Sequence, residues 1–214
     1  MKTFAHFLVL SCLLFPTLSA DAEETPLGEV AFRQALLDMG TDLRLMCVAA
    51  HPDDEDGATL AFARMRLGIQ TYAVIATRGE GGQNEIGPEL YDELAAIRTR
   101  EMMAAAKVTG AELRFLDLPE FGYSKSREET FAIWGKDEPR RRLVRVIREV
   151  RPDVVITNHD PDTGHGHHQA IGLALLEAVD AAADPGRFPE QLEEGLEPWT
   201  VARLLVRGQE AQGR

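Results

Sequence analysis

The chain has 214 residues, a length that favours one large domain over two small ones. Its composition is 44% hydrophobic and 27% charged, which supplies enough apolar side chains for a core and excludes disordered and collagen-like chains. The formal net charge of −12 repels phosphate backbones and anionic lipid, so we expect no nucleic-acid partner.

The first twenty residues are typical of a secretory signal peptide. Lys2 carries the only formal charge of this segment, and an apolar run follows from Phe7 to Leu14. Small residues at Ser19 and Ala20 offer a cleavage point. The pattern predicts a signal peptide over residues 1–20 and an exported protein, either periplasmic or extracellular.

Two other interpretations fit this segment less well. An uncleaved membrane anchor would need about 20 apolar residues to cross a bilayer, whereas Pro16 interrupts a shorter run. A lipoprotein would carry its lipid on Cys12, which lies unusually early for that purpose. We therefore expect no stable membrane insertion after cleavage. The mature chain would keep only Cys47, so a disulfide framework is excluded.

A lead-in segment, residues 21–42, precedes the regular part of the chain. Within it, residues 28–39 have the apolar spacing of an amphipathic helix that stops at Gly40. From residue 43 onwards, short apolar runs alternate with helical patterns. The runs predict strands at 43–50, 71–77, 112–118, 153–158 and 199–206. The patterns between them predict helices at 57–67, 88–109, 137–150 and 166–183.

Strands that alternate with helices are typical of a mainly parallel sheet. Parallel strands need crossover connections, and the crossover helices cover both faces of the sheet. The sequence therefore predicts an α/β fold with three layers, and we assign residues 43–214 to one domain.

Two groups of polar residues follow predicted strands. The first-strand cluster is AHPDDED at residues 50–56, and the fourth-strand cluster is NHDPDTGHGHH at residues 158–168. Together they hold five of the six histidines. In an open parallel sheet, ligands bind beyond the carboxyl ends of the strands, where the strand order reverses. If the first and fourth strands are neighbours there, the two clusters face one another across a divalent metal ion.

The residue types and spacings within these clusters suit a catalytic metal. Imidazole nitrogens and carboxylates bind zinc, and a catalytic zinc ion keeps one position open for water. His51 and Asp54 lie three residues apart across a tight turn, so they can reach one ion together. His165 and His168 have the same spacing and share one face of the first turn of the next helix. One of them can bind the metal while the other faces the substrate.

Simpler interpretations explain less of the pattern. Helix capping would account for one acid of residues 53–56, but not for four consecutive acids beside a histidine. His159 and His167 are expected to be structural or exposed. No G-x-G-x-x-G follows the first strand, and neither G-K-[ST] nor G-x-S-x-G occurs, which argues against nucleotide-binding and serine-hydrolase interpretations.

Three segments, AHPDDE at 50–55, TRGEGG at 77–82 and GHGHHQA at 164–170, resemble motifs of the PIG-L/LmbE family of metal-dependent N-acetylglucosaminyl deacetylases. The resemblance covers roughly residues 43–205 in order. It implies a Rossmann-like fold and usually one zinc ion, although iron has also been found in relatives. It also implies that residues 43–214 form a deacetylase domain that removes the N-acetyl group from an amino sugar or glycan.

The resemblance further implies roles for six residues. The metal ligands fall on His51, Asp54 and His168. The general base falls on Asp53, and the histidine that stabilises the transition state in its protonated form falls on His165. The arginine that contacts the substrate falls on Arg78; the alternative for this residue is a salt bridge to Glu80 or Glu85.

Two features depart from the family pattern. Residues 165–168 read HGHH, where the commoner form has Pro-Asp in the middle, so Asp160 or Asp162 is predicted to orient an imidazole instead. The chain also ends at Arg214, whereas many relatives continue with elements that close the substrate pocket. We expect either a short protein or part of a longer chain.

The segment 119–136 lacks clear periodicity and contains four aromatic residues. Long loops are often functional, so these aromatic faces are expected either to stack on a sugar ring or to pack into the core. The leading functional hypothesis is a zinc-dependent N-deacetylase that acts on a GlcNAc-type sugar or glycoconjugate. Two alternatives stay open: an amidase for a non-sugar amide, and a non-catalytic module that binds metal or carbohydrate.

Overall fold

The computed structural model describes residues 28–82 and 84–207. The predicted signal peptide, its cleavage point and Cys12 lie outside these residues, so export stays a prediction. Within the two described ranges, no helix is both long and apolar enough to cross a membrane.

The predicted apolar runs form five strands of a single sheet. The strands are β1 (Arg44–Ala49), β2 (Gln70–Ile75), β3 (Glu112–Phe115), β4 (Val154–Thr157) and β5 (Arg203–Val206). They are arranged in the order β3-β2-β1-β4-β5, and every neighbouring pair is parallel. The predicted α/β fold is therefore confirmed. The strand order reverses between β1 and β4, because the chain first runs outward through β2 and β3 and then returns to the other side of β1.

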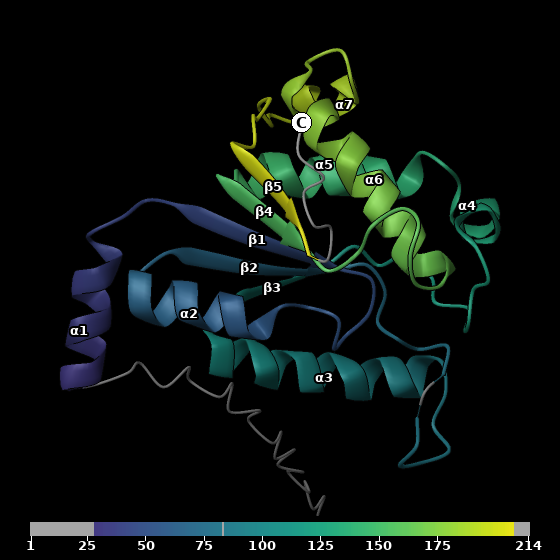
Figure 1. Ribbon diagram of the computed structural model, residues 1–214, viewed down its shortest axis with the longest axis horizontal. Helices are drawn as coiled ribbons and strands as arrows, with labels where there is room; N and C mark the ends of the chain where they lie inside the picture. The colour runs from purple at the N-terminus through teal and green to yellow at the C-terminus, as the bar shows by residue number, and fades with distance from the viewer. Residues whose placement is uncertain (1–27, 83, 208–214) are drawn as a thin grey trace, which may run out of the picture.

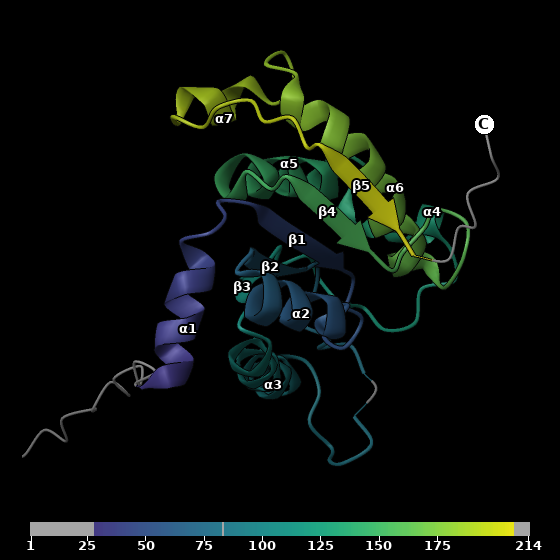
Figure 2. The same ribbon diagram turned by 60° about the vertical axis from the view of Figure 1, so that its left-hand side comes forward.

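Helices cover both faces of this sheet, as predicted. They are α1 (Glu29–Asp38), α2 (Gly57–Leu67), α3 (Asp92–Thr109), α4 (Arg127–Trp134), α5 (Glu138–Val150), α6 (Gly166–Ala183) and α7 (Pro189–Glu193). In Figures 1 and 2, α2 and α3 lie on one face and α5 and α6 on the other. The three layers of a Rossmann-like fold result.

The position of β1 at the centre of the sheet explains why the sequence of this strand is continuously apolar. Side chains alternate between the two faces of a strand, and here both faces are covered. Met46 and Val48 pack in the core formed with α5 and α6, whereas Cys47 packs with Leu60 of α2 on the opposite face. Burial raises the pKa of the Cys47 thiol to about 12, so this cysteine is an inert core residue.

Helix α4 lies inside the segment 119–136, for which no periodicity was found in the sequence. The Ser126 side chain caps the helix by accepting a hydrogen bond from the Glu129 N–H, and the Glu129 carboxylate accepts one from the Lys125 N–H. The S-x-x-E spacing of residues 126–129 is the local signal for this helix start. Among the other differences, the short helix α7 was not predicted and α3 begins at Asp92 rather than at residue 88. Strand β3 ends at Phe115 rather than at residue 118, and β5 begins at Arg203 rather than at residue 199.

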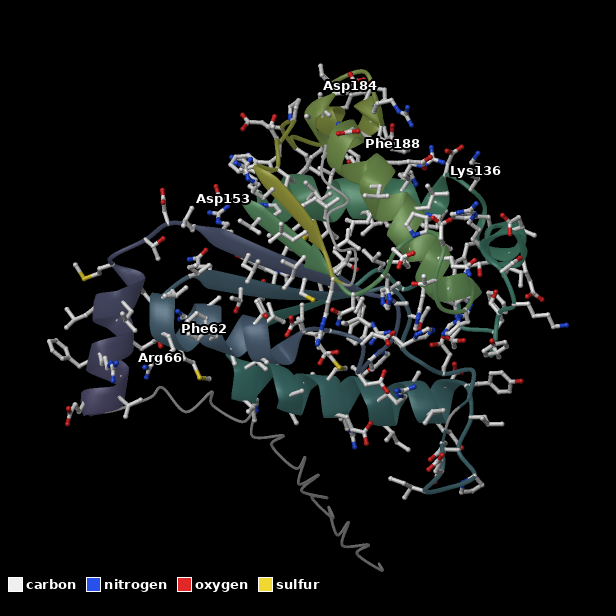
Figure 3. All side chains as sticks on the ribbon, viewed as in Figure 1. Phe62, Arg66, Lys136, Asp153, Asp184 and Phe188 are labelled. Carbon is white, nitrogen blue, oxygen red and sulfur yellow. The ribbon has the colours of Figure 1, made fainter. Side chains whose placement is uncertain are left out.

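A buried arginine closes the carboxyl-terminal end of α6. Arg148 of α5 is completely buried. Its guanidinium donates to the Gln191 side chain and to the main-chain carbonyls of Ala181, Ala182, Asp184, Arg187 and Phe188. Figure 3 shows Asp184 and Phe188 where α6 ends and the chain turns towards α7. The arginine thus satisfies carbonyls that a helix end leaves without partners.

Helix α6 approaches the loop after β4 very closely at Gly172. A Cβ atom at this position would lie 2.6 Å from the main-chain carbonyl carbon of Asp160. We expect Gly172→Ala to lower the free energy of unfolding by about 1–3 kcal/mol, because the overlap outweighs the higher helix propensity of alanine. Urea unfolding of the purified protein would measure the change.

The matched control is Gly57→Ala at the start of α2. There the nearest atom to the new Cβ, Thr109 Cγ2, lies 3.7 Å away, an ordinary contact distance. This variant is expected to be as stable as the wild type or more stable. Equal stabilities for the two variants would contradict the proposed close approach.

Candidate metal centre and active site

The two predicted clusters meet at one edge of the sheet. β1 and β4 are neighbours, with Val48 paired to Thr157, which confirms the predicted adjacency. In Figure 1 the carboxyl ends of these strands converge near the start of α6. A cavity of about 600 Å³ opens there. It is lined by His51, Asp53, Asp54, Gly79, Gly81, Gly82, Arg98, Glu120, Gly122, Tyr123, His165 and His168.

Asp54 contacts both of the other predicted metal ligands, His51 and His168. Its Oδ2 atom lies 2.9 Å from His51 Nδ1 and 3.2 Å from His168 Nε2. The turn that carries it is fixed by hydrogen bonds from the His51 N–H to Asp54 Oδ2 and from the Asp54 N–H to the His51 carbonyl. Asn158, which follows β4, donates to the Asp54 carbonyl at 2.8 Å and so connects the two clusters.

The donor atoms in this region fit a divalent metal ion. His51, His165 and His168 each offer a nitrogen within 4.8 Å of the others, and Asp54, His159 and His168 form a second such group. The Nδ1 atom of His165 is buried and has no hydrogen-bond partner among the described residues. Buried polar atoms are usually paired, so this nitrogen is available to a ligand of the cavity.

Strong mutual interactions hold His51 and Asp54 in place. Burial alone would lower the pKa of His51, but hydrogen bonds to Asp54 and Glu120 raise it to about 9. Burial opposes ionisation of Asp54, yet hydrogen bonds from His168 and His51 keep its pKa well below the usual range. A metal ion that takes an imidazole nitrogen must displace its proton, so metal binding is linked to proton release.

His159 is a structural histidine, as expected. Its Nε2 atom accepts a hydrogen bond from the Ala50 N–H at 2.9 Å, so this nitrogen is already engaged. The group of Asp54, His159 and His168 is therefore a weaker candidate for a metal than the histidines around His51. Its ring stacks on that of His168, with the centroids 4.2 Å apart. Burial lowers the pKa of His159 to about 4, so the ring is neutral and supports His168 by packing.

Asp53 faces the cavity beside the predicted ligands without joining them. Its φ angle of 98° lies in a region that non-glycine residues rarely adopt, a kind of strain found mainly at functional sites. The Oδ2 atom lies 3.2 Å from Arg98 Nη2. Burial at the cavity wall raises the pKa of Asp53, with Arg98 acting in the opposite direction. A carboxylate with a raised pKa is a better proton acceptor.

His165 lies at the cavity wall, as predicted, with its ring centroid 4.0 Å from that of His168. Burial, together with the nearby His168 and His51, lowers the pKa of His165 to about 4. The lowered pKa favours the neutral ring, and the predicted protonated form of His165 stays a prediction. A neutral imidazole still carries one N–H that it can donate.

Arg78, predicted to contact the substrate, has its described contacts with side chains outside the cavity. Its guanidinium pairs with Asp117 at 2.8 Å, donates to Thr99 and covers the ring of Phe115 at 4.2 Å. Among the described residues, the arginine that lines the cavity is Arg98 of α3, and Arg78 does not line it. The alternative partners Glu80 and Glu85 do not pair with the Arg78 side chain either; only the main-chain N–H of Arg78 reaches the Glu80 carboxylate.

The acid predicted to orient an imidazole was also assigned wrongly. The Asp160 carboxylate accepts from the N–H groups of Asp162 and Thr163, and the Asp162 carboxylate lies 3.4 Å from Arg127. Neither one bonds to an imidazole in the described part of the chain. Instead, Glu120 Oε2 lies 3.0 Å from His51 Nε2. Glu120 closely follows β3, so the rule that ligands lie beyond strand ends could have found it.

The all-parallel sheet defines an α/β protein of the Rossmann-like class. The imidazoles and carboxylates that converge at its carboxyl edge could hold a metal ion. Residues 46–179 match the PIG-L family, described as GlcNAc-PI de-N-acetylase. The chain belongs to this family.

Several relatives are named as deacetylases, in agreement with the description of the family. The chain is 36% identical over 183 residues to a 1D-myo-inositol 2-acetamido-2-deoxy-alpha-D-glucopyranoside deacetylase of Streptomyces avermitilis, which covers 76% of this chain and 60% of the relative. It is 38% identical over 168 residues to the protein of that name from Geodermatophilus obscurus, covering 69% and 56%. The chain thus spans less than two thirds of the length of these relatives.

Solved structures agree with the fold. The N,N'-diacetylchitobiose deacetylase of Pyrococcus horikoshii matches with a TM-score of 0.61 and 26% identity, over 86% of this chain and 70% of that one. A 4-carboxy-2-hydroxymuconate hydratase of Pseudomonas putida matches with a TM-score of 0.60 and 21% identity, over 76% and 64%. The latter is a likeness of fold alone, and one fold can host different reactions.

Proposed function

We propose that this protein hydrolyses the N-acetyl group of a GlcNAc-type sugar or glycoconjugate. The observation that carries the proposal is the position of Asp53, a carboxylate that lines the same cavity as His51, Asp54 and His168 but is not hydrogen-bonded to their side chains. The names of the relatives supply the substrate class, an acetylated amino sugar.

The metal ligands in this proposal are His51, Asp54 and His168. Two imidazoles and one carboxylate are a common catalytic set for zinc, and iron is the alternative ion. A divalent ion held there would polarise an amide carbonyl and lower the pKa of water. All three side chains line the cavity that would take the substrate.

The protein's own groups then move the protons. Asp53 takes a proton from the water that attacks the acetyl carbon and returns it to the departing amine, so that acetate and a free amino sugar are formed. His165 donates its N–H to the oxygen that becomes negatively charged. Arg98 holds the Asp53 carboxylate at 3.2 Å, and we assign it the contact with substrate hydroxyls that the sequence placed on Arg78.

Metal content and acetate release test the proposal together. The full chain would be purified without added metal and without chelator, and then analysed for zinc and iron. We expect about one ion per chain, together with release of acetate from an acetylated amino sugar. Metal without turnover of any acetylated sugar would favour an amidase for other amides. Saturable sugar binding without amine release would favour a non-catalytic module.

Tyr123 is expected to form part of the sugar-binding surface. Its side chain is 77% exposed, lines the cavity, and has its ring centroid 5.5 Å from that of His165. Stacking of an aromatic ring on the sugar contributes about 1 kcal/mol, so Tyr123→Ala should raise KM roughly 5-fold with little change in kcat. Tyr123→Phe retains the ring and should keep the wild-type KM. A lower kcat at unchanged KM would contradict this role.

A further inference from the structure

His51 has a second carboxylate partner, on the side of the ring opposite Asp54. Glu120 Oε2 lies 3.0 Å from His51 Nε2, and His167 Nδ1 lies 3.0 Å from the same nitrogen. Glu120 Oε1 is 3.5 Å from His167 Nδ1. Two side chains that lie far apart in the sequence, Glu120 and His167, therefore meet behind the predicted metal ligand His51.

Glu120 and His167 are buried and firmly held. The Glu120 side chain is 5% exposed, and its carboxylate accepts hydrogen bonds from the Thr77 hydroxyl at 3.1 Å and from the Gly122 N–H at 2.9 Å. His167 is completely buried, and its ring stacks on Trp134 with an interplanar angle of 8°. Glu120 and His167 therefore hold the Nε2 side of the His51 ring in place.

The chemistry of imidazole makes this contact decisive for metal binding. A neutral ring has one N–H donor and one lone pair, and the partner of one nitrogen determines which form is present. Ionised carboxylates only accept hydrogen bonds, so Asp54 at Nδ1 and Glu120 at Nε2 are both satisfied when the ring carries two protons. A metal at Nδ1 would displace the proton shared with Asp54, and Glu120 would then keep the remaining N–H on Nε2.

We propose that Glu120 is a positioning residue that holds His51 in the form and orientation needed to bind the metal through Nδ1. His167 completes the arrangement with its Nδ1 atom 3.0 Å from the same His51 nitrogen and 3.5 Å from Glu120 Oε1, at the sequence position where the commoner motif has an acid. The proposal rests on the proposed metal site at His51, Asp54 and His168. It explains how the protein orients this ligand although Asp160 and Asp162 do not.

Two substitutions of Glu120 separate hydrogen bonding from charge. Glu120→Gln keeps an acceptor oxygen at the same distance but removes the charge, whereas Glu120→Asp keeps the charge and withdraws the acceptor by one methylene. Loss of a group that hydrogen-bonds to a metal-binding histidine typically weakens metal binding about 10- to 100-fold. We expect Glu120→Asp to weaken zinc binding by this factor and Glu120→Gln to weaken it less.

The affinity would be measured by competition with a chelator, after circular dichroism has verified that each variant is folded. Asp117→Asn is the matched control, because it removes a carboxylate that pairs with Arg78 outside the cavity; its affinity should equal that of the wild type. A purely electrostatic role would make Glu120→Asp the stronger binder of the two.

Tighter zinc binding by Glu120→Asp than by Glu120→Gln would overturn the inference, and so would wild-type affinity in both variants. Glu120, His167 and His51 also form a group of donors that could itself hold an ion. If Asp54→Ala retained the metal and both Glu120 variants lost it, the ion would be on the Nε2 side, and our assignment of Nδ1 would be wrong. A wild-type protein that binds no zinc would refute the metal site of the proposed function and this inference together.

Discussion

Replacing Asp53 with Asn is expected to lower kcat by about 10²- to 10⁴-fold while the metal content stays at one ion per chain. The amide has nearly the same shape as the carboxylate, and asparagine tolerates the positive φ of 98° at this position. The fold and the ligands are thus retained, and only the proton acceptor is lost. Acetate release under saturating substrate, measured beside elemental analysis, would show both results in one preparation.

Asp54→Ala is the matched comparison at the next residue. It removes the carboxylate that lies within 3.2 Å of both His51 and His168, so we expect the metal itself to be lost, and activity with it. Near-normal turnover of Asp53→Asn would refute the role of Asp53 as general base. Full metal occupancy in Asp54→Ala would refute the assignment of Asp54 as a ligand.

The largest expected effect on stability concerns Arg148. Replacing it with Leu would leave the main-chain carbonyls at the end of α6 buried without donors, and unpaired buried groups are costly. We expect the free energy of unfolding to fall by roughly 3–5 kcal/mol. Urea denaturation followed by circular dichroism would measure the loss.

Arg145→Leu, one turn earlier on α5, provides the control. Arg145 makes an ion pair at 2.7 Å with Glu194, and both side chains are partly exposed. Pairs of this kind contribute at most about 1 kcal/mol, so this variant should remain close to the wild type. An equal loss in the two variants would mean that hydrogen bonds to the carbonyls are not the source of stability at Arg148.

The fold could be predicted largely from local patterns. The apolar runs at β1, β2 and β4 are buried strands, and the helices between them set the parallel order. Helix α4 was missed because aromatic residues at irregular spacing hide its periodicity, although the cap at Ser126 was visible in the sequence. The five-residue helix α7 is too short to show any period at all.

The site could be predicted only where its residues follow strands. His51 and His168 lie in the clusters after β1 and β4, and the strand order brings them together. Arg98 gave no such signal, because it is on a helix and reaches Asp53 only through the packing of α3. Arg78 contacts Phe115 of β3, the strand beside β2, and Asp117, which follows that strand, and nothing in the sequence indicated these contacts.

The pairing of β1 with β4 also has a consequence for how the protein folds. The paired residues Leu45 and Val154 are 109 positions apart, as are Ala50 and His159, which are hydrogen-bonded beside the site. Closing so long a loop delays this contact, and chains dominated by such contacts fold slowly. During synthesis His51 leaves the ribosome long before His168 does, so the proposed ligands come together only after the chain has been made through the start of α6.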